Sequence, residues 1–208
     1  YGMYGISAKT QGAISTTVPL LPNWQLDVPE LLPKLNSCKL IFLCSPNNPT
    51  GNRLNEADLR TVLKSAQGRC LVVIDEAYIE FCPESTLVSW LEEFDNLVIL
   101  RTLSKAFGLA SLRCGFVLAS KDILAALQLV IAPYPIAGPV AQLATRALGS
   151  ESIAKMQACV AKLNALKGEL SQALGALAFI QDVYPSDANF ILVKFRLGVC
   201  VSTLLAYL

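Results

Sequence analysis

Residues 39–75, KLIFLCSPNNPTGNRLNEADLRTVLKSAQGRCLVVID, decide the fold class. The stretch begins and ends with short apolar runs, KLIFLC at 39–44 and CLVVID at 70–75, which are typical of buried strands. Between them Asn55 is placed to cap a helix. The apolar face of that helix recurs at spacings of three and four, at Leu59, Val62, Leu63 and Ala66. A strand, a helix and a second strand in this order indicate an α/β domain.

The same alternation continues toward the C-terminus. Asn96–Arg101 and Cys114–Ala119 predict two further strands, and helical spacing follows from residue 120. One long helix is predicted from Ser150 to Leu177, and strand-like runs follow at Phe179–Val183 and Asn189–Phe195. We therefore expect a main domain over residues 1–150, and over residues 151–208 an interdomain helix with the start of a smaller domain.

The charge of the chain excludes several classes of partner. Among 208 residues there are 17 Lys and Arg against 16 Asp and Glu, so the formal net charge is +1. That balance argues against a nucleic acid or an anionic membrane as a partner. A hydrophobic fraction of 53% with only 16% charged residues is typical of buried elements and excludes disorder as the main state. The longest apolar stretch, at 123–131, is shorter than the roughly 18 residues of a membrane span.

Cysteine usage bears on the compartment. The chain has seven cysteines, no C-x-x-C pair and no histidine. This pattern predicts neither a disulfide scaffold nor a Cys/His metal site, and it favours a reducing, cytoplasmic compartment. The chain starts at Tyr1 without a signal-like region and ends in an apolar run at Val201–Leu208. We expect both ends to be cut edges of a longer chain.

Chemistry is concentrated after the third predicted strand, at Thr102-Leu103-Ser104-Lys105, with Arg113 eight residues beyond the lysine. Hydroxyls and a guanidinium are suited to bind a phosphate. A lysine in a desolvating, cationic setting is favoured as a free amine and can form a Schiff base with an aldehyde cofactor. The segment therefore suggests pyridoxal phosphate. The alternative interpretation is an ordinary surface lysine and arginine beside a Ser/Thr-rich loop.

Two other predicted strands end in polar residues. Asp75 ends its strand, and a carboxylate there could keep a pyridine nitrogen protonated. The hydroxyl of Tyr78 could reach the phenolate oxygen of a pyridoxal phosphate ring. Pro46–Gly51, PNNPTG, is a constrained loop after the neighbouring strand, and its amide side chains could donate to a ring oxygen. Taken one at a time, these residues could equally be a turn cap, a core tyrosine and an ordinary turn.

Together these segments resemble the fold-type I pyridoxal-phosphate aminotransferases, and among them the histidinol-phosphate aminotransferase family. The resemblance follows the family's order and spacing over nearly the whole chain, at YGMY (1–4), CSPNNPTG (44–51), DEAYIEF (75–81), RTLSKAFGL (101–109) and LRCGF (112–116). It implies a three-layer α/β sandwich around a mostly parallel mixed sheet, with part of a smaller α+β domain. It also implies pyridoxal 5'-phosphate as the cofactor and no metal.

The resemblance also implies roles. Lys105 resembles the Schiff-base lysine, Asp75 the partner of the pyridine nitrogen, and Asn48 and Tyr78 the donors to the phenolate oxygen. The phosphate-binding set is matched by Thr102, Ser104 and Arg113.

Two further positions follow from the resemblance. Tyr1 resembles the aromatic residue that stacks on the cofactor ring. Asn189 resembles a polar position on the substrate side of the small domain, although a strand-edge amide satisfied by backbone is an equal alternative. Ser111 stands where the family usually has glycine, and we expect the loop before Arg113 to tolerate it.

The implied activity is transamination between L-histidinol phosphate, or its keto form imidazole-acetol phosphate, and 2-oxoglutarate/glutamate in histidine biosynthesis. The expected partners are these small molecules and, in the full-length protein, a second copy of the chain. The family's N-terminal phosphate loop, a tyrosine that crosses to the partner and a C-terminal carboxylate-binding arginine have no counterpart in residues 1–208, so we expect this stretch alone to be inactive. The alternatives are a related aromatic aminotransferase, a threonine-phosphate decarboxylase, or an aminotransferase-like sensor domain of a transcription regulator.

Overall fold

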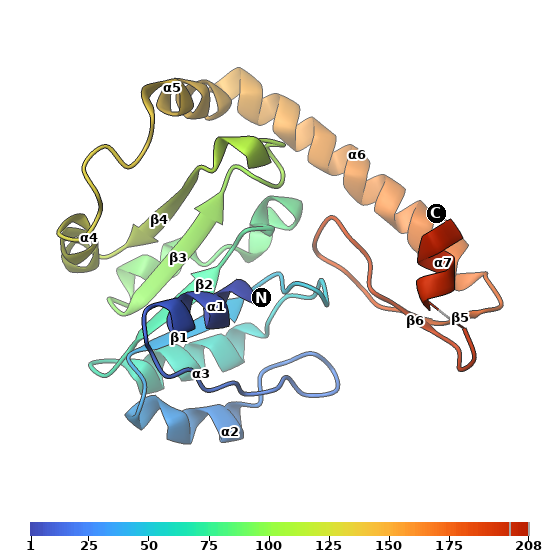
Figure 1. The fold of residues 1–208 in the computed structure, drawn as a ribbon, viewed down its shortest axis with the longest axis horizontal. Helices are drawn as coiled ribbons and strands as arrows, with labels where there is room; N and C mark the ends of the chain where they lie inside the picture. The colour runs from blue at the N-terminus through green and yellow to red at the C-terminus, as the bar shows by residue number, and fades with distance from the viewer. Residues whose placement is uncertain (200, 208) are drawn as a thin grey trace.

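A four-stranded sheet forms the centre of the computed structural model, which describes residues 1–199 and 201–207 (Figure 1). The strands lie in chain order and are β1 (Leu40–Cys44), β2 (Leu71–Asp75), β3 (Leu97–Thr102) and β4 (Gly115–Ala119). β1, β2 and β3 are parallel, whereas β4 is antiparallel to β3. The four predicted strands and the mostly parallel mixed sheet are therefore confirmed.

Each face of this sheet carries its own layer. Because side chains alternate along a strand, residues two apart point to the same face. One face buries the main core against α2 (Val28–Leu31), the 3₁₀ turn η1 (Leu32–Asn36) and α3 (Glu56–Ala66). The strand residues in or against that core include Ile41, Leu43, Val72, Ile74, Leu97 and Ile99. On β1 the opposite face carries Phe42, where Tyr4 of α1 (Met3–Thr10) stacks with ring centroids 5.0 Å apart.

α3 is built as the spacing predicts. Asn55 caps it, because its side-chain oxygen accepts bonds from the backbone N–H groups of Ala57 at 2.8 Å and Asp58 at 3.3 Å. Gly68, two residues after the helix, has a φ of +67°, which is accessible to glycine at little cost. The predicted apolar face is buried in the core and consists of Leu59, Val62, Leu63 and Ala66.

Beyond β4 the chain leaves the sheet. α4 (Lys121–Gln128) and α5 (Gly138–Ala147) lead into the long α6 (Ser150–Gly175), which carries the chain to an antiparallel pair, β5 (Ile180–Val183) and β6 (Val193–Phe195), and to α7 (Val201–Tyr207). Short 3₁₀ turns complete the fold: η2 (Ile79–Phe81), η3 (Pro83–Ser85), η4 (Val88–Glu92) and η5 (Ala110–Leu112).

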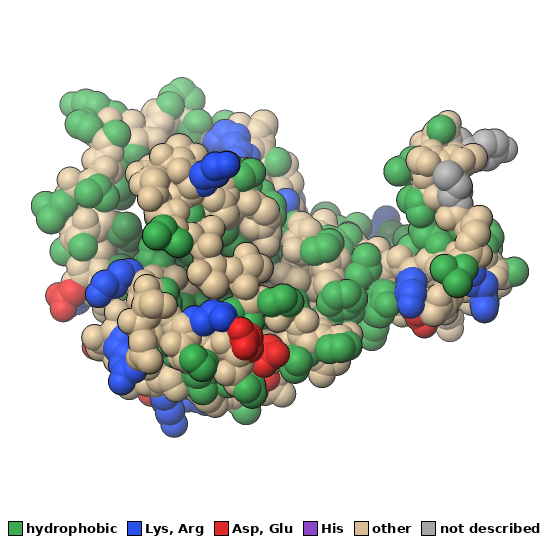
Figure 2. Space-filling view, turned by 60° about the horizontal axis from the view of Figure 1, so that its bottom comes forward, with side chains coloured by type: hydrophobic (Ala, Val, Ile, Leu, Met, Phe, Trp, Pro, Cys, Tyr) green, Lys and Arg blue, Asp and Glu red, His purple; other side chains and the backbone are tan. Residues whose placement is uncertain are grey.

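The molecule has a large body and a smaller lobe (Figure 2). The long helix predicted from residue 150 is confirmed, and it joins the two parts in Figure 1. The division into domains at residue 150 stays a prediction. Among residues 1–199 and 201–207, no helix combines the length and apolar character required to cross a membrane.

The last predicted strand is wrong at its start. The run Asn189–Phe195 was expected to be extended throughout, but β6 includes only its last three residues. The residues just before it are bonded elsewhere: the Asp187 N–H donates to the Gly51 carbonyl at 2.7 Å. Lys167 of α6 donates to the carbonyls of Ser186 and Ala188, both at 2.7 Å. These contacts hold the loop that precedes β6. Within the predicted run, the Leu192 carbonyl accepts the Tyr184 N–H at 2.9 Å, and regular pairing with β5 begins at Val193.

Candidate active site

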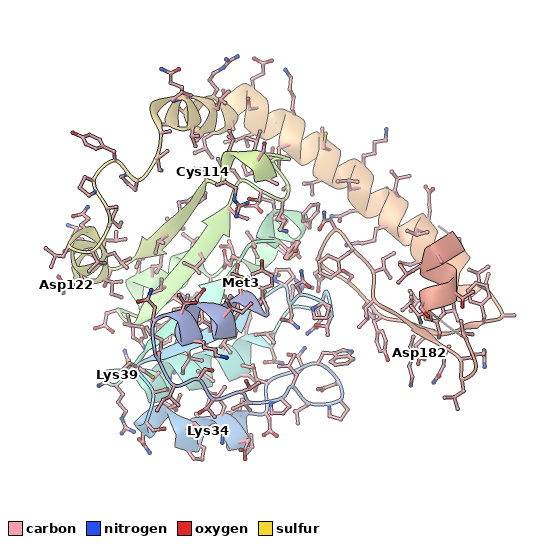
Figure 3. The ribbon with its side chains drawn as sticks, in the orientation of Figure 1. Met3, Lys34, Lys39, Cys114, Asp122 and Asp182 are labelled. Atoms are coloured by element: carbon pink, nitrogen blue, oxygen red, sulfur yellow. The ribbon has the colours of Figure 1, made fainter. Side chains whose placement is uncertain are left out.

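The sheet brings the predicted site residues to one edge. The carboxyl ends of the parallel strands β1 to β3 meet there, and the antiparallel β4 contributes its amino end. In the register, Cys44 pairs with Asp75, and Asp75 pairs with Leu100. Asp75 therefore points to the same face as α1, away from the main core. Figure 3 shows Met3 of α1 in front of the sheet and Cys114 at the start of β4.

A cavity of about 300 Å³ opens at this edge. Its volume is at the lower end of the roughly 300–1,000 Å³ of small-molecule sites. The predicted site residues that line it are Tyr1, Asn48, Asp75, Tyr78, Thr102, Ser104, Lys105 and Arg113. Cys44, Ala77, Leu100, Arg101 and Gly115 complete the lining. Eight residues singled out far apart in the sequence thus share one cavity, and the roles assigned to them remain predictions.

Asp75 is held by two donors. Its Oδ1 accepts the backbone N–H of Ala77 at 3.0 Å, and its Oδ2 accepts the hydroxyl of Tyr4 at 2.6 Å. An ionised carboxylate has about four acceptor positions on its two oxygens, so both contacts leave room for a further donor from the cavity. The two bonds thus fix the orientation of the Asp75 carboxylate, and its oxygens can still accept a further hydrogen bond.

Asn48 and Tyr78 form the middle of the cavity. The Asn48 amide donates to the Tyr78 hydroxyl at 3.0 Å. The Tyr78 ring is only 5% exposed, and the Lys105 ammonium lies 5.1 Å from its centroid, within the range of a cation–π contact. The Tyr78 side chain therefore connects the loop that carries Asn48 with the lysine.

The third part of the cavity is suited to an anion. The Thr102 hydroxyl lies 2.9 Å from the Ser104 hydroxyl and accepts the Ser104 backbone N–H at 3.1 Å. Arg113 has a φ of +51°, just after η5, which contains Ser111. Its guanidinium donates to the Ala110 carbonyl at 3.0 Å and is otherwise exposed. Two hydroxyls and a guanidinium that line one cavity are groups suited to bind phosphate.

Asn189 does not join this set. Its side chain is exposed, it lies in the loop before β6 rather than in a strand, and it does not line the cavity. The neighbouring Phe190 packs edge-on against Tyr78, with ring centroids 5.2 Å apart. The alternative of a buried strand-edge amide is therefore wrong for Asn189, and its substrate-side role stays a prediction.

An ion pair supports the site and was not anticipated. Glu76, which is 1% exposed, accepts two bonds from the Arg101 guanidinium on Oε2, at 2.8 and 3.1 Å. It also accepts the Leu87 backbone N–H at 2.7 Å. Arg101 further lies 3.9 Å from Glu80, whose pKa is raised above its ordinary value by burial. The pair fixes the end of β3 to the segment that carries Tyr78.

Tyr4 was also missed, although it belongs to the YGMY segment. Its position three residues after Tyr1, in a segment that could form a helix, was the available signal, because residues three apart lie on one helix face. The two rings are in edge contact, with centroids 5.6 Å apart.

Comparisons with known proteins identify the family of the chain. The family model "aminotransferase class I and II" matches residues 1–196. The histidinol-phosphate aminotransferase of Yersinia enterocolitica is 52% identical over 195 residues, which are 94% of this chain and 52% of that protein. The chain thus spans about half the length of the curated histidinol-phosphate aminotransferases it matches.

Solved structures share the fold. The histidinol-phosphate aminotransferase of Clostridium acetobutylicum superposes with a TM-score of 0.85 at 27% identity, over 95% of this chain and 60% of that one. The Sinorhizobium meliloti histidinol-phosphate aminotransferase, solved in complex with pyridoxal-5'-phosphate, also reaches a TM-score of 0.85, at 23% identity, over 97% of this chain and 54% of that one.

Proposed function

This chain belongs to the aminotransferase class I and II family, and from that membership we propose that the full-length protein transfers an amino group between L-histidinol phosphate and 2-oxoglutarate. The observation that carries the proposal is the single cavity shared by Lys105, Asp75, Asn48 and Tyr78. The substrate class is supported by relatives at 52% identity that are named histidinol-phosphate aminotransferases.

The donor set of the cavity fits pyridoxal 5'-phosphate. A carboxylate is present for the ring nitrogen, a phenol and an amide for the ring oxygen, and a primary amine for the aldehyde. The hydroxyls of Thr102 and Ser104 with the Arg113 guanidinium match the phosphate. Tyr1, which is 59% exposed and lies at the mouth of the cavity, offers a flat face to the ring. Each functional group of the cofactor therefore has at least one counterpart of suitable chemistry.

In the proposed mechanism the chain's own residues bind, orient and move protons. When bound, pyridoxal phosphate supplies a ring that stabilises negative charge on the adjoining substrate carbon. The Asp75 carboxylate would face the ring nitrogen, and the Asn48 amide and Tyr78 hydroxyl would hold the ring oxygen. The Lys105 Nζ would take the proton from the amino-bearing carbon of the substrate and return it on the cofactor side of the carbon–nitrogen bond, which is the proton transfer that transamination requires.

The partners and the compartment are part of the same proposal. The exposed leucines of α6, Leu163, Leu166 and Leu170, support a further protein contact, which the family resemblance assigns to a second copy of the full-length chain. Free thiols at the described cysteines, among them Cys44 and Cys82, support a reducing cytoplasm. The partners in the reaction are small molecules.

The test is an assay of the full-length protein with histidinol phosphate, phenylalanine and threonine phosphate as competing substrates. We expect glutamate to form from 2-oxoglutarate fastest with histidinol phosphate. The Lys105→Ala variant should abolish turnover, whereas Lys64→Ala, on the exposed surface of α3, should leave it unchanged. Faster reaction with phenylalanine would identify an aromatic aminotransferase, and carbon dioxide release from threonine phosphate would identify a decarboxylase. Lack of turnover with all three would favour a sensor domain.

A further inference from the structure

Tyr4 makes the shortest hydrogen bond to the carboxylate of the candidate site. Its hydroxyl donates to Asp75 Oδ2 at 2.6 Å across 71 residues of sequence. The bond is part of a partly buried arrangement, because the Tyr4 ring stacks on Phe42 of β1 with an interplanar angle of 25°. The helix α1 therefore presents this hydroxyl to Asp75 from a fixed ring.

The hydroxyl is held in its protonated form. Burial, together with the neighbouring Cys44 and Asp75, raises the pKa of Tyr4 far above its ordinary value. A phenol that keeps its proton at every physiological pH acts as a donor toward a carboxylate, and such charge-assisted bonds are short and strong. The direction of the bond is thus from Tyr4 to Asp75.

We propose that Tyr4 is a positioning residue that holds Asp75 in the orientation required to keep the cofactor's ring nitrogen protonated. The inference rests on the proposed function and deepens it. The Ala77 N–H fixes Oδ1 and the Tyr4 hydroxyl fixes Oδ2, so the carboxylate cannot rotate away from the cavity without losing a bond. One acceptor position on Oδ2 remains for the ring nitrogen.

The orientation of Asp75 determines how well it supports a proton on the ring nitrogen. A carboxylate held toward the cavity by Tyr4 and the Ala77 N–H would face the ring nitrogen and stabilise its positive charge. Without the hydroxyl, Asp75 is free to turn away, and the ring nitrogen would lose its proton at a lower pH. Tyr4 acts on the ring through Asp75 and does not need to touch the substrate.

The test uses the full-length protein loaded with pyridoxal phosphate labelled with ¹⁵N in the ring. The Tyr4→Phe variant keeps the ring that stacks on Phe42 and removes only the hydroxyl. The matched control is Tyr134→Phe, the same change at a tyrosine that is 96% exposed. The ring-nitrogen chemical shift, followed against pH, reports protonation directly and does not depend on turnover.

We expect the pH at which the ring nitrogen loses its proton to fall by about one unit in Tyr4→Phe, a tenfold change in the protonation equilibrium. The control should titrate like the wild type. Borohydride should still attach the cofactor to Lys105 in all three proteins.

Superimposable titrations of the wild type and Tyr4→Phe would overturn the inference while leaving the proposed function intact. Loss of the folded circular dichroism spectrum in Tyr4→Phe would also overturn it, by identifying Tyr4 as a packing residue. A wild-type protein that binds no cofactor at Lys105 would instead overturn the proposed function, and the inference with it.

Discussion

Replacing Arg101 by methionine tests how firmly the buried ion pair supports the site. The change removes two bonds to Glu76 Oε2 and leaves a carboxylate that is 1% exposed without its cation. Breaking a buried pair in this way costs about 3–5 kcal/mol. The Thr86 hydroxyl and the Leu87 N–H still donate to Glu76, so we expect the lower end, about 3 kcal/mol.

The assay is urea unfolding of the full-length protein followed by circular dichroism. With a slope of about 2–3 kcal/mol per molar urea, a loss of about 3 kcal/mol lowers the midpoint by roughly 1–1.5 M. Lys155→Met is the matched control, because its pair with Glu151 has a distance of 2.6 Å but is largely exposed. That pair should contribute less than about 1 kcal/mol.

A double variant, Arg101→Met with Glu76→Gln, separates the pair from its surroundings. Because both charges are then absent, its cost should be clearly smaller than the sum of the two single costs. The reasoning is refuted if Arg101→Met unfolds at the same urea concentration as Lys155→Met, or if the two single costs simply add.

Three further predictions concern the cavity and its surroundings. Lys105→Ala should bind pyridoxal phosphate without a covalent bond, so borohydride should label no residue, and labelling of another lysine would contradict the role of Lys105. Asp75→Asn should keep the cofactor but lose most transamination, whereas Arg113→Ala should mainly weaken cofactor affinity. Cofactor affinity is measured by equilibrium dialysis and transamination by initial rates. If the two variants lost affinity and rate to the same extent, the separate roles of Asp75 and Arg113 would be contradicted. Burial raises the pKa of Glu80 in the folded state above its ordinary value of 4.5. The folded state therefore holds this proton more tightly than the unfolded chain does, and stability falls as the pH rises from 4.5 through the raised pKa. Glu80→Gln should therefore raise the urea midpoint at pH 7 and not at pH 4, and an equal shift at both pH values would exclude the titration of Glu80 as the cause.

Local patterns were enough to predict the sheet. The apolar runs at 39–44 and 70–75 and the cap at Asn55 depend on neighbours in sequence, and the structure contains all three. Because parallel strands end at one edge, Asp75 and Lys105 could be expected close together before any coordinates were known. Their shared cavity follows from topology.

Contacts made across long separations could not be predicted in this way. Nothing in the sequence near residue 187 indicates that Asp187 bonds to a loop more than 130 residues earlier, or that the chain before Val193 forms a loop and not a strand. Tyr4 and Arg101 were missed for the same reason, because neither partner, Asp75 nor Glu76, lies on the same element. Propensity and periodicity describe how an element forms, whereas these bonds depend on where two elements meet.

The docking of Asp187 on the loop that carries Asn48 has a consequence for recombining this protein with its relatives. The Arg53 guanidinium pairs with Asp187 at 3.2 Å, and Ser186 lies so close to Gly51 that a Cβ added there would collide with it. Residues 45–53 and 184–190 must therefore be exchanged together in a recombinant protein, although more than 130 positions separate them. Chimaeras should be viable when both segments come from the same parent, and a single crossover between the segments should impair folding.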